Sequence, residues 1–288
     1  MKHYHMYTTV LILSLFLIGC SSDDSPVINE PIEISKEIKS LIYFRGDEKA
    51  PTVLINAQAG PSTALDQEII DFFVDDFNTA GILTVNVHQA QTLTPSIVND
   101  NDITLEQAVN FNAESIETLA KVITYFKDQG RTVYVLGLSF GAFVTQGLIA
   151  KKGIDIADKY LIISGRLDMN DVMWQGLAEG KEGYFENGVT PILDSEPLAN
   201  AKNRNLQRLS SGFGKNRYTK LLNTIEDLSS VTYIYGATDI AVGGLTADEV
   251  LFLESKNANI LAGDGGHDEP FVGFLEQGLN EAFGIQLQ

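Results

Sequence analysis

Cysteine is nearly absent from this 288-residue chain, in which Cys20 is the only one. A lone cysteine cannot form an internal disulfide. Cations are also scarce, because 20 lysines and arginines stand against 38 aspartates and glutamates, which gives a formal net charge of −18. So acidic a chain repels nucleic acids, heparin-like glycans and anionic membranes. We therefore expect no nucleic-acid partner.

Motifs for the common cofactors are missing as well. The chain has no G-x-G-x-x-G motif, no G-K-S or G-K-T phosphate loop and no cysteine–histidine metal spacing. The acidic stretch at residues 99–102 contains calcium-type ligands. However, an EF-hand loop that began at Asp100 would need glycine at the position of Leu105. We therefore expect no cofactor and no metal.

The N-terminal apolar run, residues 10–19, is too short to span a bilayer, which takes about 20 residues. Together with Lys2 it has the layout of a signal peptide. It ends in L-I-G-C at residues 17–20, which resembles the lipobox of bacterial lipoproteins. The resemblance implies cleavage after residue 19 and acylation of Cys20. The alternative is an ordinary signal peptide with an unrelated cysteine.

The residues behind Cys20 are typical of a flexible tether. Residues 21–26 read S-S-D-D-S-P, which is short, polar and acidic. They resemble the acidic surface-export signal of Bacteroidetes lipoproteins. We expect a signal peptide at residues 1–19 and an acylated cysteine with its tether at 20–35. The protein would then belong to the cell envelope, anchored to the outer membrane through Cys20, and the export signal implies exposure at the surface.

The remaining residues, 36–288, are enough for one large domain. Apolar and β-branched runs alternate along it with amphipathic helical patterns. The predicted strands are 36–45, 52–58, 82–88, 132–136, 160–164, 231–236 and 259–262. Such alternation predicts an α/β fold in which helices cover both faces of a mostly parallel sheet.

Capping patterns mark three of the helix starts. They are T-x-x-D at residues 63–66, T-x-x-Q at residues 104–107 and T-A-D-E at residues 246–249. A further amphipathic helix is predicted near the C-terminus, over residues 271–282.

A strand and a helix meet at the pentapeptide G-L-S-F-G, residues 137–141. The strand T-V-Y-V-L precedes it, and the helix behind it ends in two lysines and a glycine at residues 151–153, a C-terminal pattern. A sharp turn here would raise Ser139 above the sheet in a strained conformation and aim the following N–H groups at its target. Ser139 is therefore our candidate nucleophile. The alternative is a tight turn without chemistry.

A nucleophilic serine needs a base, and the chain offers few histidines. His3 and His5 lie in the predicted signal peptide, and His88 ends a predicted strand well before the serine. His267 lies in the glycine-rich stretch 263–270, where an imidazole can reach over the end of the sheet. We predict that His267 is the base and that His88 has a structural role.

The imidazole in turn needs a carboxylate that fixes its tautomer and stabilises its charged form. Asp239 follows the predicted strand 231–236, and its loop neighbours the histidine loop. Asp168, after an earlier strand, and Asp264 and Asp268, which flank the histidine, are rivals. We favour Asp239, because it gives the chain order serine, aspartate, histidine.

With these motifs in this order, the chain resembles the α/β-hydrolase-fold serine hydrolases from about residue 36 to its C-terminus. The resemblance implies an oxyanion hole that combines the N–H of Phe140 with one in the loop after Gln58. This loop reads Q-A-G-P, where many members have a His-Gly-Gly-Pro-like sequence. Ala59 and Gly60 are both candidate donors. The alternative is a Rossmann-like turn without hydrolase activity.

Residues 169–230 interrupt the alternation and are too long for a simple βα connection. We interpret them as an insertion that forms a lid or cap. Six cations fall within 19 residues of it: Lys202, Arg204, Arg208, Lys215, Arg217 and Lys220. They would suit recognition of an anionic substrate group, or they form a solvated helical face balanced by acidic neighbours, the interpretation that we favour.

The predicted activity is acyl transfer to water. Ser139, His267 and Asp239 would cleave a small-molecule or glycan-borne ester through an acyl-serine. Esters are the commonest target of the family that the chain resembles. Amide or peptide cleavage is the alternative, because the same triad serves both. A second alternative is a binding lipoprotein that has the fold without turnover.

Overall fold

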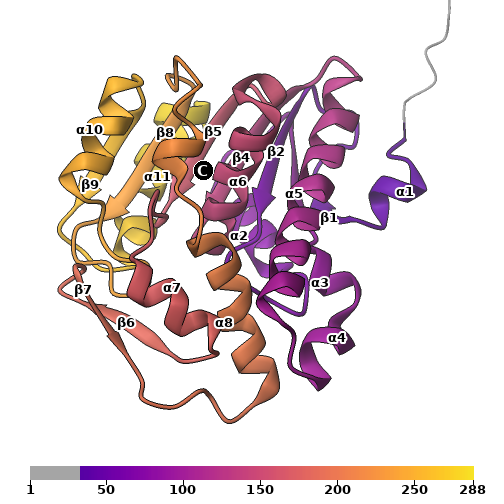
Figure 1. Ribbon diagram of the computed structural model, residues 1–288. Helices are drawn as coiled ribbons and strands as arrows, with labels where there is room; N and C mark the ends of the chain where they lie inside the picture. The colour runs from indigo at the N-terminus through magenta and orange to yellow at the C-terminus, as the bar shows by residue number, and fades with distance from the viewer. Residues whose placement is uncertain (1–32) are drawn as a thin grey trace, which may run out of the picture. The chain divides into compact units, whose positions relative to one another are not determined.

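Seven strands form one sheet in the part of the chain that the structure describes (Figure 1). The structure is a computed structural model that describes residues 33–288, so the predicted signal peptide, Cys20 and most of the tether lie outside it. In sheet order the strands are β1 (Ile42–Arg45), β3 (Ile82–Val87), β2 (Thr52–Ala57), β4 (Thr132–Leu138), β5 (Lys159–Ile163), β8 (Val231–Gly236) and β9 (Asn259–Gly263). β1 pairs antiparallel with β3, and the other six strands are parallel. The predicted α/β fold with a mostly parallel sheet is confirmed.

Two cores, one on each face of the sheet, bind the helices to it. Successive side chains of β2 alternate between them, because Val53 and Ile55 lie in one core and Leu54 in the other. The first core contains α5 (Leu105–Lys127), α6 (Phe140–Lys152) and α10 (Ala247–Ser255), and the second contains α2 (Glu68–Asp76) and α11 (Glu269–Phe283). Helices therefore cover both faces, as a buried parallel sheet requires.

Two of the predicted helix starts are confirmed in atomic detail. At the start of α5, Thr104 Oγ1 accepts from the Gln107 N–H at 3.1 Å, and Gln107 Oε1 accepts from the Thr104 N–H at 2.8 Å. Thr246 and Glu249 form the same capping box at the start of α10. Within residues 33–288, no helix combines the length and the apolar character needed to cross a membrane.

The prediction of a strand over residues 36–45 is wrong in its first half. Lys36–Lys39 form a short helix, α1, and β1 takes only the second half. Ser35 caps α1, because its Oγ accepts from the Ile38 N–H at 3.3 Å. Ile34 and Ile38 are both buried and lie four residues apart, which is helical spacing.

The helix predicted from residue 63 begins later, at Glu68. The buried side chain of Gln58 holds residues 63–67 as a loop instead. Its Nε2 donates to the Ala64 carbonyl at 2.8 Å, and its Oε1 accepts from the Asp66 N–H at 3.2 Å. A contact with the preceding strand end thus overrides the local start signal.

Residues 169–230 lie between β5 and β8 in the chain. These two strands are neighbours in the sheet, so the whole segment is an excursion from it. They contain α7 (Asp171–Ala178), the hairpin of β6 (Gly183–Glu186) and β7 (Thr190–Leu193), α8 (Ala201–Gly214) and α9 (Tyr218–Leu221). Figure 1 shows α7, α8 and the hairpin grouped together at the lower end of the view.

Buried polar contacts attach α8 to the body of the domain. The side chain of Asn205 on α8 is completely buried. Its Oδ1 accepts from the Ile103 N–H at 3.0 Å. Its Nδ2 donates to two carbonyls, one in α4 (Pro95–Asp100) at 2.7 Å and one in the residue after α4 at 2.6 Å. Because its carbonyl oxygen and its amide nitrogen are both bonded, this amide fixes the position of α8.

Candidate active site

The turn between β4 and α6 holds Ser139 in a strained conformation, with φ 54° and ψ −114°. A non-glycine residue with positive φ is uncommon and persists only where the surroundings enforce it. Glycine is needed on both sides of the turn. A Cβ on Gly141 would collide with the Ala57 carbonyl, and a Cβ on Gly137 would collide with Gly141. The two glycines therefore let α6 approach β2 and β4 closely enough to form the turn.

Ser139, His267 and Asp239 form one hydrogen-bonded line at the edge where the parallel strands end. His267 Nε2 lies 2.9 Å from Ser139 Oγ, and His267 Nδ1 lies 2.7 Å from Asp239 Oδ2. The three residues follow β4, β9 and β8, whose parallel arrangement brings these turns to one edge. With the Nδ1 proton donated to the aspartate, Nε2 can accept the serine proton.

Asp239 is fixed as the acceptor in this line. Its side chain is only 2% exposed. Oδ1 accepts from the N–H groups of Ala241 at 2.8 Å and Val242 at 2.9 Å, while Oδ2 faces His267. Burying a carboxylate is costly unless it is paired and hydrogen-bonded. Here both oxygens are engaged, so the carboxylate is held in one orientation toward His267.

The surroundings of His267 act on its pKa in opposite directions. Burial lowers the pKa, but the hydrogen bond and the negative charge of Asp239 outweigh burial. The charges of Asp268 and Glu269 add to the effect of Asp239. The net result is a pKa above the ordinary value of 6.5. Such an imidazole binds a proton more readily, which suits a group that takes one from a serine.

The other candidate carboxylates, those of Asp168, Asp264 and Asp268, are not the ones that bind the His267 ring. Asp168 accepts hydrogen bonds from the N–H of Thr219, at 3.2 Å, and from its hydroxyl. Asp264 and Asp268 flank His267 in the sequence, but within residues 33–288 the ring nitrogens of His267 contact Ser139 and Asp239 instead. The structure thus brings the favoured aspartate to the histidine and leaves Asp168 in a contact with α9.

His88 is bound away from the triad. Its Nδ1 lies 2.6 Å from Thr92 Oγ1, and its backbone N–H donates to the Leu41 carbonyl at 2.9 Å. Burial lowers its pKa below the ordinary value, which favours the neutral ring. These contacts agree with the structural role predicted for it.

The predicted oxyanion donors are the amides of Phe140, Ala59 and Gly60. Phe140 opens α6, so its N–H lies at a helix N-terminus, where the dipole favours negative charge. Among the described residues, no protein group accepts a hydrogen bond from any of the three amides. Within residues 33–288, these three amides are therefore not engaged by another protein group.

Gln89 fixes the loop that carries Ala59 and Gly60, a role that the sequence pattern did not indicate. Its buried Nε2 donates to the carbonyls of Gln58 at 3.0 Å and Gly60 at 2.9 Å, and its Oε1 accepts from the Ser62 N–H at 3.2 Å. In a trans peptide the C=O and the following N–H point in opposite directions. The N–H of Ala59 therefore points away from Gln89. The only signal in the sequence for this role was that Gln89 directly follows the predicted strand 82–88.

Ser164 is a second residue that the sequence pattern did not indicate. It follows β5, is completely buried and has a φ of 50°. Its Oγ donates to the carbonyl of His267 at 2.7 Å, and its N–H donates to the Ile234 carbonyl of β8 at 2.9 Å. The neighbouring carbonyl of Ile163 accepts from the Ser139 N–H at 2.9 Å. The end of β5 thus ties the histidine to the strands that carry the serine and the aspartate.

A cavity of about 220 Å³ lies beside Ser139. Two phenylalanines of α6 form part of its apolar wall, Phe140 and Phe143, together with Val242 behind Asp239. The insertion supplies the rest of the wall through Met169, Leu177, Glu182, Gly183, Gln207 and Ser210. The residues that surround a substrate here are therefore drawn largely from the insertion.

The six cations of the insertion do not line this cavity. Arg204 and Arg208 pair with Asp102 at 2.8 and 2.5 Å, and Arg217 pairs with Asp171. These arginines therefore bind acidic neighbours, in agreement with the interpretation that we favoured from the sequence. They supply no anion-binding group at the cavity.

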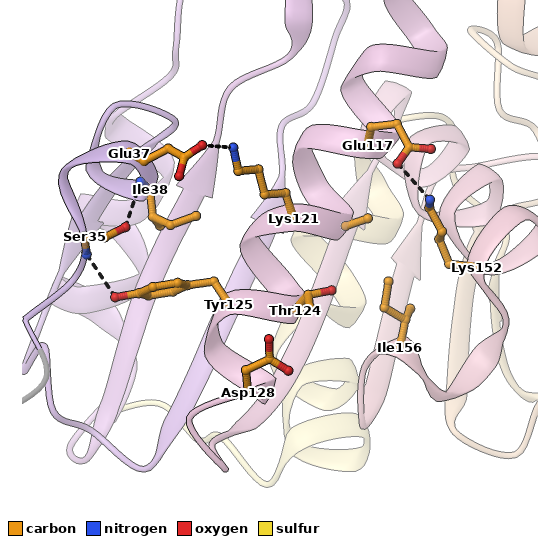
Figure 2. Close-up of a pocket in the computed structure, with 11 residues that line it drawn as sticks. Ser35, Glu37, Ile38, Glu117, Lys121, Thr124, Tyr125, Asp128, Lys152 and Ile156 are labelled. Atoms are coloured by element: carbon orange, nitrogen blue, oxygen red, sulfur yellow. Dashed lines mark hydrogen bonds and ion pairs between the residues drawn. The ribbon is translucent and has the colours of Figure 1, made fainter.

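A larger groove of about 410 Å³ borders α1 and α5, and none of its lining residues belongs to the triad (Figure 2). Its lysines are paired, Lys121 with Glu37 and Lys152 with Glu117, the latter at 2.7 Å. The Tyr125 hydroxyl accepts from the N–H of the residue that caps α1, at 2.9 Å. The contacts of Lys121 and Tyr125 thus hold α1 against α5, and the Lys152–Glu117 pair joins α6 to α5.

Solved structures share this architecture at low sequence identity. An α/β-hydrolase enzyme from a Medee basin deep-sea metagenome library has a TM-score of 0.54 at 14% identity, over 84% of this chain and 94% of that one. A highly thermostable carboxyl esterase from Bacillus coagulans has a TM-score of 0.53 at 12% identity, over 84% and 93% of the two chains. A lipase-esterase related protein from Clostridium acetobutylicum has a TM-score of 0.51 at 12% identity, over 85% of this chain and 98% of that one.

At the level of sequence, no family model and no curated protein matches the chain. The structural similarity, together with the observed strand order, shows that the domain has the α/β-hydrolase fold. Because folds host many activities, the chemistry has to be argued from the site itself.

Proposed function

We propose that the protein is a serine hydrolase that cleaves carboxylic esters through an acyl-serine intermediate. The observation that carries the proposal is the line from Ser139 through His267 to Asp239, with separations of 2.9 and 2.7 Å. A serine within hydrogen-bond reach of a base that a third group orients has the geometry of an activated nucleophile. The strained turn, which exposes the hydroxyl to a cavity, gives a carbonyl carbon room to approach.

In the first half of the reaction, Ser139 Oγ attacks the ester carbonyl carbon, and its proton passes to His267 Nε2. Asp239 holds the ring and stabilises the imidazolium. The carbonyl oxygen becomes an oxyanion, which the N–H of Phe140 and one in the loop after β2 would stabilise. The bond to the alcohol oxygen then breaks, and His267 gives its proton to the departing alcohol.

In the second half, a water molecule takes the place of the alcohol. The oxygen of this water attacks the acyl carbon while His267 accepts one of the water's protons. The same amides would stabilise the second oxyanion. The bond to Ser139 Oγ breaks and the serine regains its proton from His267. The products are a carboxylic acid and the restored enzyme.

Esters come before amides in this proposal because an alcohol is the better leaving group. Cleaving an amide requires protonation of a nitrogen that leaves poorly, so the same triad faces a lower activation barrier with an ester. The printed name of the Bacillus coagulans structure, a carboxyl esterase, agrees with this choice for a protein of the same fold. An amidase or peptidase with this triad would differ in the groups around the cavity.

The test combines active-site labelling with turnover. A fluorophosphonate probe should label Ser139, and the protein should hydrolyse an activated acetate ester, while Ser139→Ala should do neither. Ser229→Ala is a matched control, because Ser229 is bonded to Asp227 away from the triad. Faster cleavage of a peptide than of the ester would show an amidase. Absence of both labelling and turnover would show a binding protein without catalysis.

We also propose that Cys20 anchors the protein to a membrane of the cell envelope. The support is the L-I-G-C sequence at residues 17–20 and the polar tether behind it. Each buried CH₂ of an acyl chain contributes about 0.8 kcal/mol to membrane binding, so several chains give a firm anchor. Cys20→Ser should move the protein from the membrane fraction to the soluble fraction. Retention of the serine variant in the membrane would contradict the proposal.

A further inference from the structure

The cavity beside Ser139 has a charge of one sign. Among the described residues, Glu182 is the only charged side chain that lines it. Glu182 lies between α7 and β6 and is exposed to solvent. The neighbouring cation, Lys181, pairs with Glu179 at 2.7 Å instead. Within residues 33–288, none of the ion pairs involves Glu182, so no bound cation neutralises the one charged residue of the lining.

Two polar side chains of α8 line the cavity with Glu182. They are Gln207 and Ser210, both half-buried. The Ser210 hydroxyl donates at 3.3 Å to the Leu206 carbonyl one turn earlier, which leaves its oxygen able to accept. A carboxylate, an amide oxygen and a hydroxyl oxygen offer hydrogen-bond acceptors here, while the amide NH₂ of Gln207 is a donor. Acceptors outnumber donor groups on this wall, so it suits groups that carry N–H or O–H donors.

The size of the cavity limits what can be bound. Its volume of about 220 Å³ lies below the range of roughly 300–1,000 Å³ typical of pockets for drug-sized ligands. The part of an ester that enters must therefore be short, and Phe140 and Phe143 give it apolar contact on one side.

We infer that this cavity selects short esters whose bound group is cationic or carries hydroxyl groups, and that it discriminates against esters bearing a carboxylate or a phosphate. The inference rests on the proposed esterase activity. An anionic group in the cavity would approach the charge of Glu182 without a cation to offset it. The formal net charge of −18 acts in the same direction during association. This preference is opposite to the binding of an anionic substrate group, which the six cations at residues 202–220 would have suited.

The test compares three acetate esters of two-carbon alcohols that differ in charge. They are the monoacetate of ethylene glycol, the acetate of 2-(trimethylammonio)ethanol and the acetate of glycolic acid. At low ionic strength, kcat/KM for the cationic ester should exceed that for the anionic ester by roughly tenfold, because the carboxylate acts on both with opposite signs. Glu182→Gln should shrink this ratio roughly fivefold, and Glu182→Lys should invert the preference. Added salt should weaken the preference, because Glu182 is exposed.

A matched control is Glu186→Gln, which removes the same charge from an exposed residue of β6 that does not line the cavity. The ratio of the three esters should stay the same in this variant. An unchanged ratio in both Glu182 variants, or an equal change in the Glu186 variant, would overturn the inference. If the unmodified protein hydrolyses none of the three esters, the proposed function itself fails. Activity on the neutral ester therefore separates the two failures.

Discussion

Two loops meet over Ser139, and they are built in different ways. We call residues 237–244 the acid loop and residues 264–268 the histidine loop. In the acid loop, the carboxylate of Asp239 is buried and accepts from two N–H groups of its own loop. The histidine loop contains two glycines and is bound mainly by its backbone carbonyls. One loop fixes a side chain from within, and the other depends on residues outside it.

The contacts of the histidine loop come from the residue after β5 and from the acid loop. Ser164, after β5, donates to the His267 carbonyl at 2.7 Å. Thr238, after β8, donates from its hydroxyl to the Asp264 carbonyl at 3.1 Å and from its N–H to the Gly265 carbonyl at 3.2 Å. The difference suits the two roles that we propose. In the proposed reaction the acid would keep one orientation, while the base would serve the serine, the leaving alcohol and a water in turn.

The largest expected effect tests whether the two loops serve one nucleophile. Ser139→Ala and His267→Ala should each lower kcat on an activated ester by roughly 10⁶, and the double variant should be scarcely slower than either. The reason is that the remaining partner has nothing to act with. His88→Ala is the control and should keep nearly full turnover. If the two single losses multiply in the double variant, the residues act independently and the triad is wrong.

The next effect separates the charge of the acid from the structure of its loop. Asp239→Asn keeps an Oδ1 that can accept from Ala241 and Val242, so the acid loop should stay folded. It presents an NH₂ group to His267, which favours the wrong tautomer and should lower kcat by roughly 10⁴. Circular dichroism checks the fold and steady-state kinetics the turnover. Asp168→Asn should have a much smaller effect, and the opposite order would show that the acid is misassigned.

A smaller effect tests the external support of the histidine loop. Ser164→Gly removes the hydroxyl but adopts the positive φ easily, so the fold should be kept. We expect kcat to fall roughly tenfold with little change in KM, because a misplaced base costs rate rather than binding. Thr238→Val is the matched comparison, and its loss should be smaller, because the Thr238 N–H still binds the loop. A Ser164→Gly variant with full kcat would show that the contact does not position the base.

The smallest effect is a shift with pH. Turnover needs neutral His267, so kcat/KM should fall as the pH drops through a pKa above 6.5. In Asp239→Asn the carboxylate that raises the pKa of His267 is lost, so the fall in kcat/KM should move to lower pH. A raised histidine pKa stabilises the folded state below the unfolded pKa, and this stability is lost as the pH rises through the folded pKa. The variant should therefore be more destabilised at about pH 5 than at about pH 9 in thermal unfolding. Equal destabilisation at both would contradict the coupling.

Local signals in the sequence predicted much of the fold and all three members of the hydrogen-bonded line. The strand β8 and the capping boxes of α5 and α10 depend on residues that are neighbours in the chain, and they were predicted correctly. The serine turn was recognisable because its two glycines and its serine lie within five residues. The order of the strand ends then placed the aspartate and the histidine.

The features that were missed depend on partners far away in the chain. The hydrogen bond of Ser164 spans 103 residues, and Gln89 reaches back 31 residues to the Gln58 carbonyl. No pattern within a strand or a helix indicates such a contact. The loop at residues 63–67 was predicted as helix for a different reason, because its competing bonds come from a side chain outside the helical pattern, that of Gln58.

The attachment of α8 has a consequence for the time course of turnover. If α8 moved away from the body, the amide of Asn205 would lose its bonds, and each buried group left unpaired costs about 1–3 kcal/mol. We therefore expect α8 to keep its position during the proposed reaction, without an opening step. Hydrolysis of a dissolved ester should then start at its full rate, without a lag. An oil–water interface should bring no burst of activity, because no closed helix has to be displaced first.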